Sequence, residues 1–435
     1  MSHYKAYPEY KESGVKWIGS VPEHWELTRF KYVSELNPKK STVTTERNEL
    51  CTFLPMEKLK TDTIILDETR VIDEVYDGYS YFADDDILIA KVTPCFENKN
   101  IAVAKGLVNG VGFGSTEINT IRAKANANNR FLYYRLQEDQ FLKIAISEMT
   151  GSGGLKRVPS ELFQIFKFAI PSYEEQALIA AQIDKENQRI HTLITKKTRF
   201  IELLKEKRQA LITHVVTKGL NPNVHMKDSG VEWIGKIPEH WEVKPFFSLL
   251  TELKRKNTGL VETNILSLSY GRVIQKSENR NMGLVPESYE TYQIVEQGEV
   301  VFRFTDLQND KRSLRSALVQ ERGIISSAYM AVSLRNIDSN YFSWLMRSYD
   351  LCKVFYGMGG GVRQSLKFED VRRLQVLVPP KEEQAEIAAH VDRQLAHNDS
   401  LVEKTERSIN LLKERRSAFI TAAVTGQIDL RGEPV

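Results

Sequence analysis

The sequence predicts an α+β protein built from two copies of one module. Two domains of mixed α/β structure are separated by two long antiparallel coiled-coil helices, in a pseudo-twofold internal repeat. Three observations predict this fold class. Paired segments recur at nearly constant offsets, a long segment without helix breakers closes each copy, and the segments between them mix strand and helix patterns. At 435 residues the chain is also long enough for more than one core.

The first repeated segment is rich in tryptophan and opens each copy. Residues 12–30 are ESGVKWIGSVPEHWELTRF, and residues 228–246 are DSGVEWIGKIPEHWEVKPF. Twelve of these nineteen positions are identical, at an offset of 216 residues.

The second repeated segment begins at Pro171 and again at Pro379. The sequence PSYEEQALIAAQID pairs with PPKEEQAEIAAHVD at an offset of 208, with nine of fourteen positions identical. By contrast, the intervening segments 31–170 and 247–378 differ broadly in sequence and differ in length by eight residues. Simple duplication followed by drift is the alternative, but drift alone should not preserve the ends of each copy so selectively. We therefore expect a constant frame that carries two divergent inserts.

The segments that close the two copies are predicted to be long helices. Residues 174–217 contain no Pro or Gly, while Pro171 precedes them and Gly219 and Pro222 follow them. Apolar residues recur at coiled-coil spacing at Ile190, Ile194, Ile201, Leu204, Leu211, Val215 and, in the second copy, Val402, Ile409, Leu412 and Phe419. Polar residues take the same seam at Lys197, Arg208, Asn398 and Thr405. A helix of about 44 residues is roughly 65 Å long and cannot bury its own seam, so we expect the two copies to pack antiparallel.

The inserts are predicted to be α+β. Strand patterns occur at 64–66, 86–92, 101–104, 299–304 and 330–334. Aromatic helical stretches at 131–149 and 341–356 follow, and each is succeeded by a cluster of glycines and then by basic or amide residues.

These blocks resemble the specificity subunits of type I restriction–modification enzymes. The resemblance rests on the Trp-Ile-Gly…Pro-Glu-His-Trp block at 17–25 and 233–241 and on the Pro…Glu-Glu-Gln…Ile-Ala block at 171–180 and 379–388. Four blocks in this order cover essentially the whole chain. The resemblance implies an N-terminal target recognition domain at 1–171, a central spacer helix at 172–226, a C-terminal target recognition domain at 227–378 and a C-terminal spacer helix at 379–435.

The resemblance also implies a function. Each half is expected to read one part of a bipartite site in double-stranded DNA, while two methyltransferase subunits bind the frame and restriction subunits join them. The chain itself is expected to be non-catalytic, so S-adenosylmethionine, ATP and Mg²⁺ would be bound by the partner subunits. The small net charge of +3 suggests that DNA affinity is shared with a partner.

Motifs for an enzyme of another kind are not found in the sequence. It has no G-x-x-x-x-G-K-[ST] loop, and Asn37-Pro38 and Asn221-Pro222 lack the Asn-Pro-Pro-Tyr pattern of amino-methyltransferases. The repeated His24 and His240 are interpreted as packing residues, and the acidic triplet 84–86 as a turn before a strand. Three scattered cysteines and no long apolar run favour the cytoplasm. A fused methyltransferase or nuclease and a coiled-coil adaptor without a DNA role stay as alternatives.

Candidate DNA-contact residues were chosen for their type and their position after a strand or a glycine cluster. Arg and Lys commonly contact phosphates or guanine, and Asn and Gln commonly contact adenine. In the first copy the candidates are Lys91, Thr93, Asn98, Lys99, Lys156 and Arg157. In the second copy they are Arg303, Thr305, Gln308, Lys311, Arg312, Arg315, Arg363 and Gln364. Lys91 and Thr93 match Arg303 and Thr305 at an offset of 212, while solvated surface charge is the alternative for each residue.

Overall fold

The computed structural model describes residues 4–152, 154–276, 288–307, 314–358 and 365–432, and the chain divides into two compact units. The first unit consists of residues 1–197 and 407–435, and the second unit consists of residues 198–406. Each unit contains one insert together with a part of both long helices. The predicted domains, in which each spacer helix is a separate segment, therefore do not coincide with these contact-defined units.

The two long helices are α6 (Tyr173–Lys218) and α10 (Lys381–Val424), as the sequence predicts. They form because no Pro or Gly interrupts them, and paired glutamates occupy the first turn of each, where the helix dipole favours negative charge. Each helix is followed within two residues by a glycine with a positive φ, +77° at Gly219 and +74° at Gly426.

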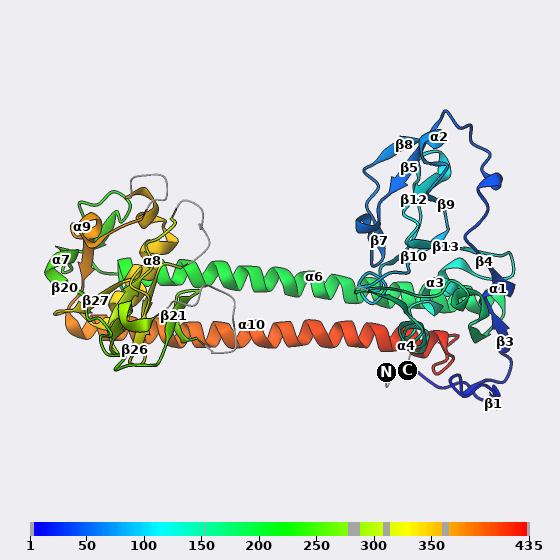
Figure 1. Cartoon of the computed structure of the whole chain (residues 1–435). Helices are drawn as coiled ribbons and strands as arrows, with labels where there is room; N and C mark the ends of the chain where they lie inside the picture. Colours follow the sequence, from blue (N-terminus) through cyan, green and yellow to red (C-terminus); the bar gives the residue numbers. More distant parts are fainter. Residues whose placement is uncertain (1–3, 153, 277–287, 308–313, 359–364, 433–435) are drawn as a thin grey trace. The chain divides into compact units, whose positions relative to one another are not determined.

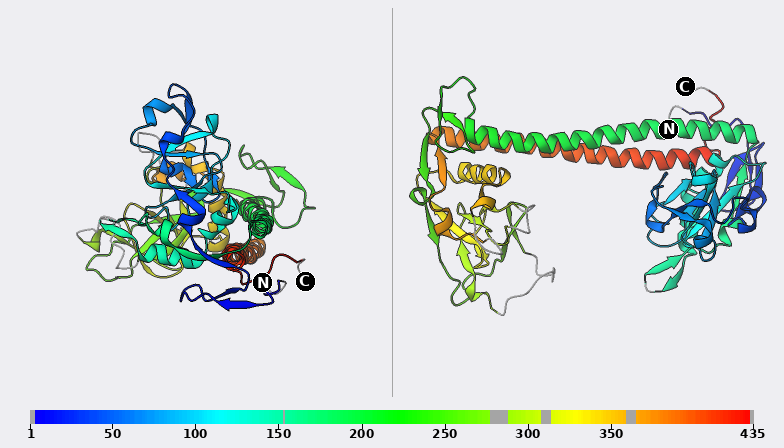
Figure 2. Two further views of the ribbon diagram at one scale, coloured as in Figure 1. Left: turned by 90° about the vertical axis from the view of Figure 1, so that its right-hand side faces the viewer. Right: turned by 90° about the horizontal axis from the view of Figure 1, so that it is seen from above.

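Within each unit the segments of α6 and α10 run side by side in opposite directions (Figures 1 and 2). In the first unit, Arg415 Nη2 donates to Glu186 Oε1 over 3.0 Å. In the second unit, Asn398 Nδ2 donates to the Leu204 carbonyl over 2.9 Å. Ile190, Ile201, Leu204, Val215 and Phe419 are buried, and the other predicted seam residues are partly buried. The structure thus confirms the antiparallel pairing.

The insert of the first unit contains two four-stranded sheets. The sheet of order β11-β10-β13-β4 is antiparallel, and the sheet of order β8-β5-β12-β9 contains one parallel pair, β5 with β12. The strands are β4 (Ser34–Leu36), β5 (Leu50–Leu54), β8 (Thr69–Val71), β9 (Ser80–Ala83), β10 (Ile87–Ala90), β11 (Ile101–Val103), β12 (Val111–Gly114) and β13 (Ile118–Ala123). Residues of the long helices share a core with strands of the first sheet but not with those of the second, which lies farther from α6 (Figure 1).

Helices α3 (Asn129–Arg135) and α4 (Asp139–Ser147) attach this insert to the long helices. The predicted helical stretch at 131–149 is therefore divided into two helices, because the chain is extended at Glu138, where ψ is 146°. Glu138 and Arg135 form an ion pair of 2.9 Å with both side chains almost fully buried. Phe131, Ile179, Ile183 and Phe419 lie in the same hydrophobic core.

The insert of the second unit repeats the first of these sheets. Its sheet has the order β20-β27-β24-β25, which matches β4-β13-β10-β11 strand for strand. The strands are β20 (Leu250–Leu253), β24 (Val300–Phe302), β25 (Ser316–Leu318) and β27 (Met330–Leu334). Helix α8 (Ser339–Leu351) takes the place of α3 and α4. The second sheet is reduced, among the described residues, to two pairs: β21 (Leu266–Ser269) with β22 (Arg272–Gln275), and β23 (Gln293–Val295) with β26 (Gly323–Ile325).

The remaining elements are short and occur mostly in matched pairs. The frame hairpins are β1 (Tyr10–Glu12) with β2 (Ser20–Pro22), and β17 (Met226–Asp228) with β18 (Lys236–Pro238). Strand β3 (Glu26–Arg29) pairs with β16 (Lys167–Ile170), and β19 (Glu242–Pro245) with β28 (Gln375–Val378). The others are β6 (Leu59–Lys60), β7 (Thr63–Ile64), β14 (Thr150–Ser152), β15 (Leu155–Arg157), α1 (Phe30–Val33), α2 (Ile72–Val75), α5 (Leu162–Ile165), α7 (Phe246–Leu249) and α9 (Phe368–Val371).

Four of the five predicted strands are found in place, three of them shorter than expected, whereas the strand predicted at 64–66 is wrong beyond Ile64. Strand β27 has the predicted bounds, and β7 ends at Ile64, where the prediction of a strand at 64–66 begins. In the part of the chain that the structure describes, none of the helices has the length and apolar character needed to cross a lipid bilayer.

Candidate nucleic-acid interface

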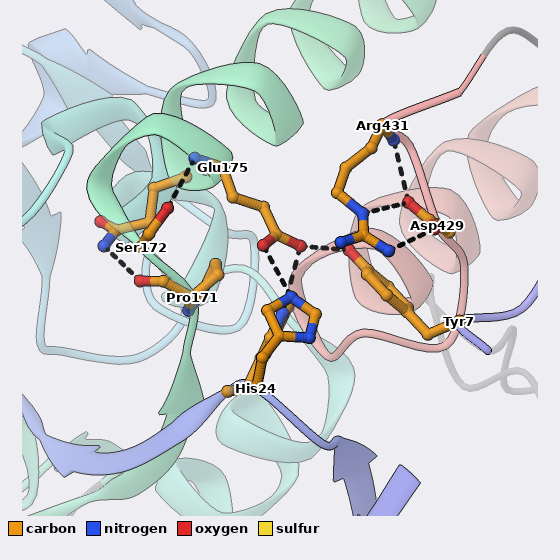
Figure 3. A network of polar contacts seen from close by, with 9 residues as sticks. Tyr7, His24, Pro171, Ser172, Glu175, Asp429 and Arg431 are labelled. Atoms are coloured by element: carbon orange, nitrogen blue, oxygen red, sulfur yellow. Dashed lines mark hydrogen bonds and ion pairs between the residues drawn. The ribbon is translucent and has the colours of Figure 1, made fainter. Parts of the chain in front are cut away.

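The two repeated sequence blocks meet in each unit and form the frame that carries the insert. In the first unit, the Glu175 carboxylate accepts hydrogen bonds from Trp25 Nε1 at 3.2 Å and Tyr7 Oη at 2.7 Å, and it lies 2.8 Å from His24 Nε2 (Figure 3). Trp25 is completely buried. Burial and the hydrogen bond to Glu175 raise the pKa of Tyr7 well above its ordinary value. The Pro-Glu-His-Trp block is thereby fixed to the first turn of α6.

The second unit repeats this contact at the start of α10. Trp241 Nε1 donates to Glu383 Oε2 over 3.1 Å, and His240 Nε2 lies 2.8 Å from the same oxygen. The matched histidines therefore pair with a frame carboxylate in both copies, in agreement with the structural role inferred from the sequence.

The glutamine of each Glu-Glu-Gln block joins the frame to the insert. Gln176 Nε2 donates to the Pro171 carbonyl over 2.9 Å, and its Oε1 accepts from Asn128 N over 2.8 Å. Asn128 in turn caps α3 by accepting from Phe131 N. In the second unit, Gln384 makes the same bonds to Pro379 O and Asp338 N, at 2.7 Å each. Such matched polar contacts explain why the frame keeps its sequence while the inserts diverge.

The end of the other long helix completes each frame. An added Cβ on Gly219 would lie 3.4 Å from the Trp241 ring, and one on Gly426 would lie 3.4 Å from the Trp25 ring. In the first unit the chain ends also join, because Lys5 forms a β-bridge with Asp429 and Arg431 pairs with Asp429 at 2.8 Å (Figure 3). Each frame is therefore assembled from segments that are distant in the sequence.

The structure brings together several candidate DNA-contact residues of the first unit. Thr93 N donates to the Lys156 carbonyl, Lys156 N donates to Thr93 Oγ1, and Thr93 Oγ1 donates to the Gly154 carbonyl, each at 2.9 Å. Lys91 is joined to the same region, because its carbonyl accepts from Val158 N over 2.8 Å. The turn after β10 and the β14–β15 hairpin thus form one continuous surface, on which Lys156 and Arg157 are exposed.

Arg157 is held in position by a carboxylate that the sequence analysis missed. Its Nε and Nη2 atoms lie 2.9 Å and 2.7 Å from the two oxygens of Glu117, in a bidentate ion pair. This contact lowers the pKa of Glu117 below its ordinary value. Glu117 lies between β12 and β13, and no local sequence signal links it to Arg157, 40 residues away.

Lys99 and Asn98 occupy different environments. Asn98 is exposed at the tip of the turn. Lys99 Nζ donates instead to Ser417 Oγ on α10, at 3.0 Å, and burial lowers the pKa of Lys99. Lys99 is thus in contact with the spacer helix, and its predicted DNA contact stays a prediction.

In the second unit, Arg303 and Thr305 lie at the end of β24, at the place that Lys91 and Thr93 take in the first unit. Both are partly exposed. Leu366 N donates to the Phe304 carbonyl over 3.0 Å, so the segment after the glycine cluster returns to the strand end in this copy as well.

Arg315 is a poor candidate for DNA contact. Its side chain is completely buried, and its guanidinium donates to the Thr305 carbonyl at 3.0 Å and to the Asp306 carbonyl at 3.4 Å. The buried Asp350 carboxylate accepts from Arg315 N, and burial raises the pKa of Asp350. Arg315 holds the loop that carries Thr305, so a structural role corrects the prediction. The candidates Gln308, Lys311, Arg312, Arg363 and Gln364 lie outside the described residues.

Across the described ranges, no group of three or more His, Cys, Asp or Glu residues is arranged to hold a metal ion. Asp84 and Asp85 form the predicted turn, but Asp86 is buried and pairs with Arg122 at 2.6 Å. The triplet is therefore a turn followed by a structural ion pair.

The chain is similar to proteins of known type. No family model matches it. The EcoEI and EcoAI specificity subunits of type I restriction enzymes from Escherichia coli are 37% and 38% identical to it over 168 and 178 residues. These segments cover 38% and 40% of this chain but only 28% and 30% of the relatives, so the match spans less than a third of their length. The putative type I restriction enzyme MjaX specificity subunit of Methanocaldococcus jannaschii is 23% identical, with 97% of this chain and 98% of that relative covered.

Solved structures show the same fold. A chain from a study of complex assembly in a type I R-M system has a TM-score of 0.69 at 16% identity, with 94% of this chain and 99% of that chain covered. The HsdS subunit of Thermoanaerobacter tengcongensis has a TM-score of 0.57 at 15% identity, with 96% and 100% covered. The chain is thus a relative of the type I restriction enzyme specificity subunits and has the fold of a solved HsdS subunit.

Proposed function

We propose that the chain is the DNA-specificity subunit of a type I restriction–modification complex, in which each unit reads one part of a bipartite site. One observation carries this proposal: the same frame and the same sheet order occur twice, while the inserts differ broadly in sequence. The specificity-subunit relatives support it.

The chemistry of the matched strand ends suits duplex DNA. Lys91 in one unit is replaced by Arg303 in the other, and Thr93 is retained as Thr305. Cationic side chains provide phosphate contacts, and a change from Lys to Arg alters the geometry available for bidentate contact with guanine. Two readers with similar scaffolds and different contact residues would recognise two different half-sites.

The proposed complex supplies the catalysis that we do not assign to this chain. Two methyltransferase subunits would bind the repeated frame, one at each copy, and restriction subunits would join them in the cytoplasm. S-adenosylmethionine, ATP and Mg²⁺ would be bound by those subunits. A fused enzyme is not favoured, because the sequence lacks the phosphate-loop and methyltransferase motifs.

Selection from a pool of randomised duplexes tests this function. The reconstituted complex with its methyltransferase subunit should enrich a split motif, with two defined parts separated by a fixed number of undefined bases. The methyltransferase subunit alone provides the control and should enrich no motif. Enrichment of one uninterrupted motif would contradict the two-reader proposal, and retention of no duplex would favour the adaptor alternative.

A further inference from the structure

In the first unit, the turn after β10 is attached to the C-terminal spacer helix. Lys99 Nζ donates to Ser417 Oγ over 3.0 Å, and Ser417 Oγ donates to Asp139 Oδ1 over 3.0 Å. Asp139 is fixed in turn, because its backbone N donates to Thr421 Oγ1 over 3.1 Å. Three segments distant in the sequence therefore meet at one hydroxyl of α10.

The turn that carries Lys99 is closed by its own backbone hydrogen bonds. Backbone hydrogen bonds of 2.9–3.0 Å close it from Phe96 N to Val92 O, from Lys99 N to Phe96 O and from Asn100 N to Cys95 O. Thr61 Oγ1 also donates to the Lys99 carbonyl over 3.0 Å. Asp62, the next residue, pairs with Arg416 of α10, so the helix contacts this region at two adjacent positions.

The other end of the turn is bonded to the candidate DNA surface. Thr93 exchanges two backbone and side-chain hydrogen bonds with Lys156 and one with Gly154, all at 2.9 Å. A continuous series of contacts therefore runs from Ser417 through Lys99 and Thr93 to the β14–β15 hairpin.

The surroundings of Lys99 favour positioning over phosphate contact. Its side chain is 35% exposed, its Nζ is 3.9 Å from Asp139 Oδ1, and burial lowers its pKa. A phosphate at this position would compete with the Ser417 hydroxyl and the Asp139 carboxylate for the ammonium.

We propose that α10 positions the DNA-contact turn of the first unit through Ser417, Asp139 and Lys99. A residue of the spacer helix thereby controls how sharply the N-terminal insert discriminates its half-site. This inference rests on the proposed function. The repeat offers a matched control, because Gln209 occupies the equivalent position of α6, at the offset of 208, and is exposed.

Two variants and two controls test the proposal in the reconstituted complex. Ser417→Ala removes the hydroxyl, Ser417→Thr retains it, Lys99→Ala removes the other partner, and Gln209→Ala is the matched control. The measurement is the discrimination ratio at each half-site, taken from randomised-duplex selection, together with the salt dependence of binding. The melting temperature of each variant shows whether it has remained folded.

Ser417→Ala and Lys99→Ala should each lower discrimination at the same single half-site about two- to ten-fold, as expected for one hydrogen bond. Combining Ser417→Ala with Lys99→Ala should cost less than the sum of the two single changes, because both remove the Lys99–Ser417 hydrogen bond, although Ser417→Ala also removes the bond to Asp139. Ser417→Thr and Gln209→Ala should leave that half-site unchanged.

Other results would overturn the proposal. If Lys99 contacted phosphate directly, Lys99→Ala would weaken binding uniformly and lower the salt slope by about one, and Ser417→Ala would change nothing. If the wild-type complex selected no motif at all, the proposed function itself would fail, which is a distinguishable outcome.

Discussion

The two units share one frame but anchor it differently. In the first unit the frame carboxylate, Glu175, is almost fully buried and has three partners, one of them Tyr7. In the second unit the side chain of Glu383 is 23% exposed, and it pairs with His240 and Trp241. The first unit contains both chain ends, so its frame joins three separate segments and needs the additional bonds. The repeat is therefore symmetric in architecture and unequal in how it is stabilised.

Removal of the frame carboxylates, Glu175 and Glu383, should give the largest difference in stability between the two units. Glu175→Ala leaves the buried Tyr7 hydroxyl and the Trp25 indole N–H without an acceptor, and we expect a loss of about 3 kcal/mol in the stability of the first unit. Glu383→Ala should cost the second unit about 1–2 kcal/mol, because water can reach this site. Hydrogen–deuterium exchange in denaturant resolves the two units. The Glu→Gln variants are controls that retain an acceptor and should lose less, and equal losses in both units would contradict the comparison.

Substitution of the glycines that follow the long helices, Gly426 and Gly219, should give a smaller difference in stability. An added Cβ on Gly426 would lie 2.6 Å from Pro22, whereas the nearest atom at Gly219 is the flexible Glu383 Oε1 at 3.0 Å. Both residues have a positive φ. Gly426→Ala should therefore destabilise by about 2–3 kcal/mol and Gly219→Ala by about 1 kcal/mol.

Gly14→Ala separates backbone strain from steric overlap, because Gly14 has a φ of +68° and no atom within 4 Å of an added Cβ. Gly14→Ala should destabilise the protein by about as much as Gly219→Ala when both are measured in the same denaturation experiment. A larger loss of stability for Gly219→Ala than for Gly426→Ala would contradict this prediction.

Tyr7 should give the first unit a dependence on alkaline pH. Its pKa is raised in the folded state by burial and by the hydrogen bond to Glu175, so its contribution is complete below the unfolded pKa of about 10 and is lost as pH rises above that value. Tyr7→Phe should reduce the slope of unfolding free energy against pH above pH 10 by about one proton. The measurement is denaturation of the first unit at a series of pH values, and an unchanged slope would show that Tyr7 does not titrate with unfolding.

The sequence predicts the frame well, because its signals are repeated and local. The run without Pro or Gly at 174–217 matches α6 within one residue at each end, whereas the predicted spacer segments 172–226 and 379–435 extend past the C-terminal ends of α6 and α10. The seam follows from heptad spacing, and Asn398 does contact the partner helix. Glu175 and Gln176 are identical to the matched residues of the second copy. This identity predicts that they have a role in the frame, but it does not predict which residues they contact.

The candidate site is predicted less completely, because its contacts join residues that are distant in the chain. Thr93 and Lys156 are separate predictions, one from its position after a strand and the other from its position after a glycine cluster; the structure brings them into contact, and their DNA contact stays a prediction. Arg315 was chosen by charge, although a buried guanidinium that binds carbonyls cannot be distinguished from an exposed one by residue type. Glu117 and Ser417 were missed, since their partners lie 40 and 318 residues away.

Exchange of one insert tests the central claim most directly. Residues 31–170 should be replaced by the corresponding insert of another specificity subunit, and methylated positions should be mapped in cells that carry the exchanged chain and its methyltransferase partner. The account predicts that one half of the split motif changes while the other half and the number of bases between them stay the same. A change in both halves, or no change in either, would contradict the assignment of one half-site to each unit.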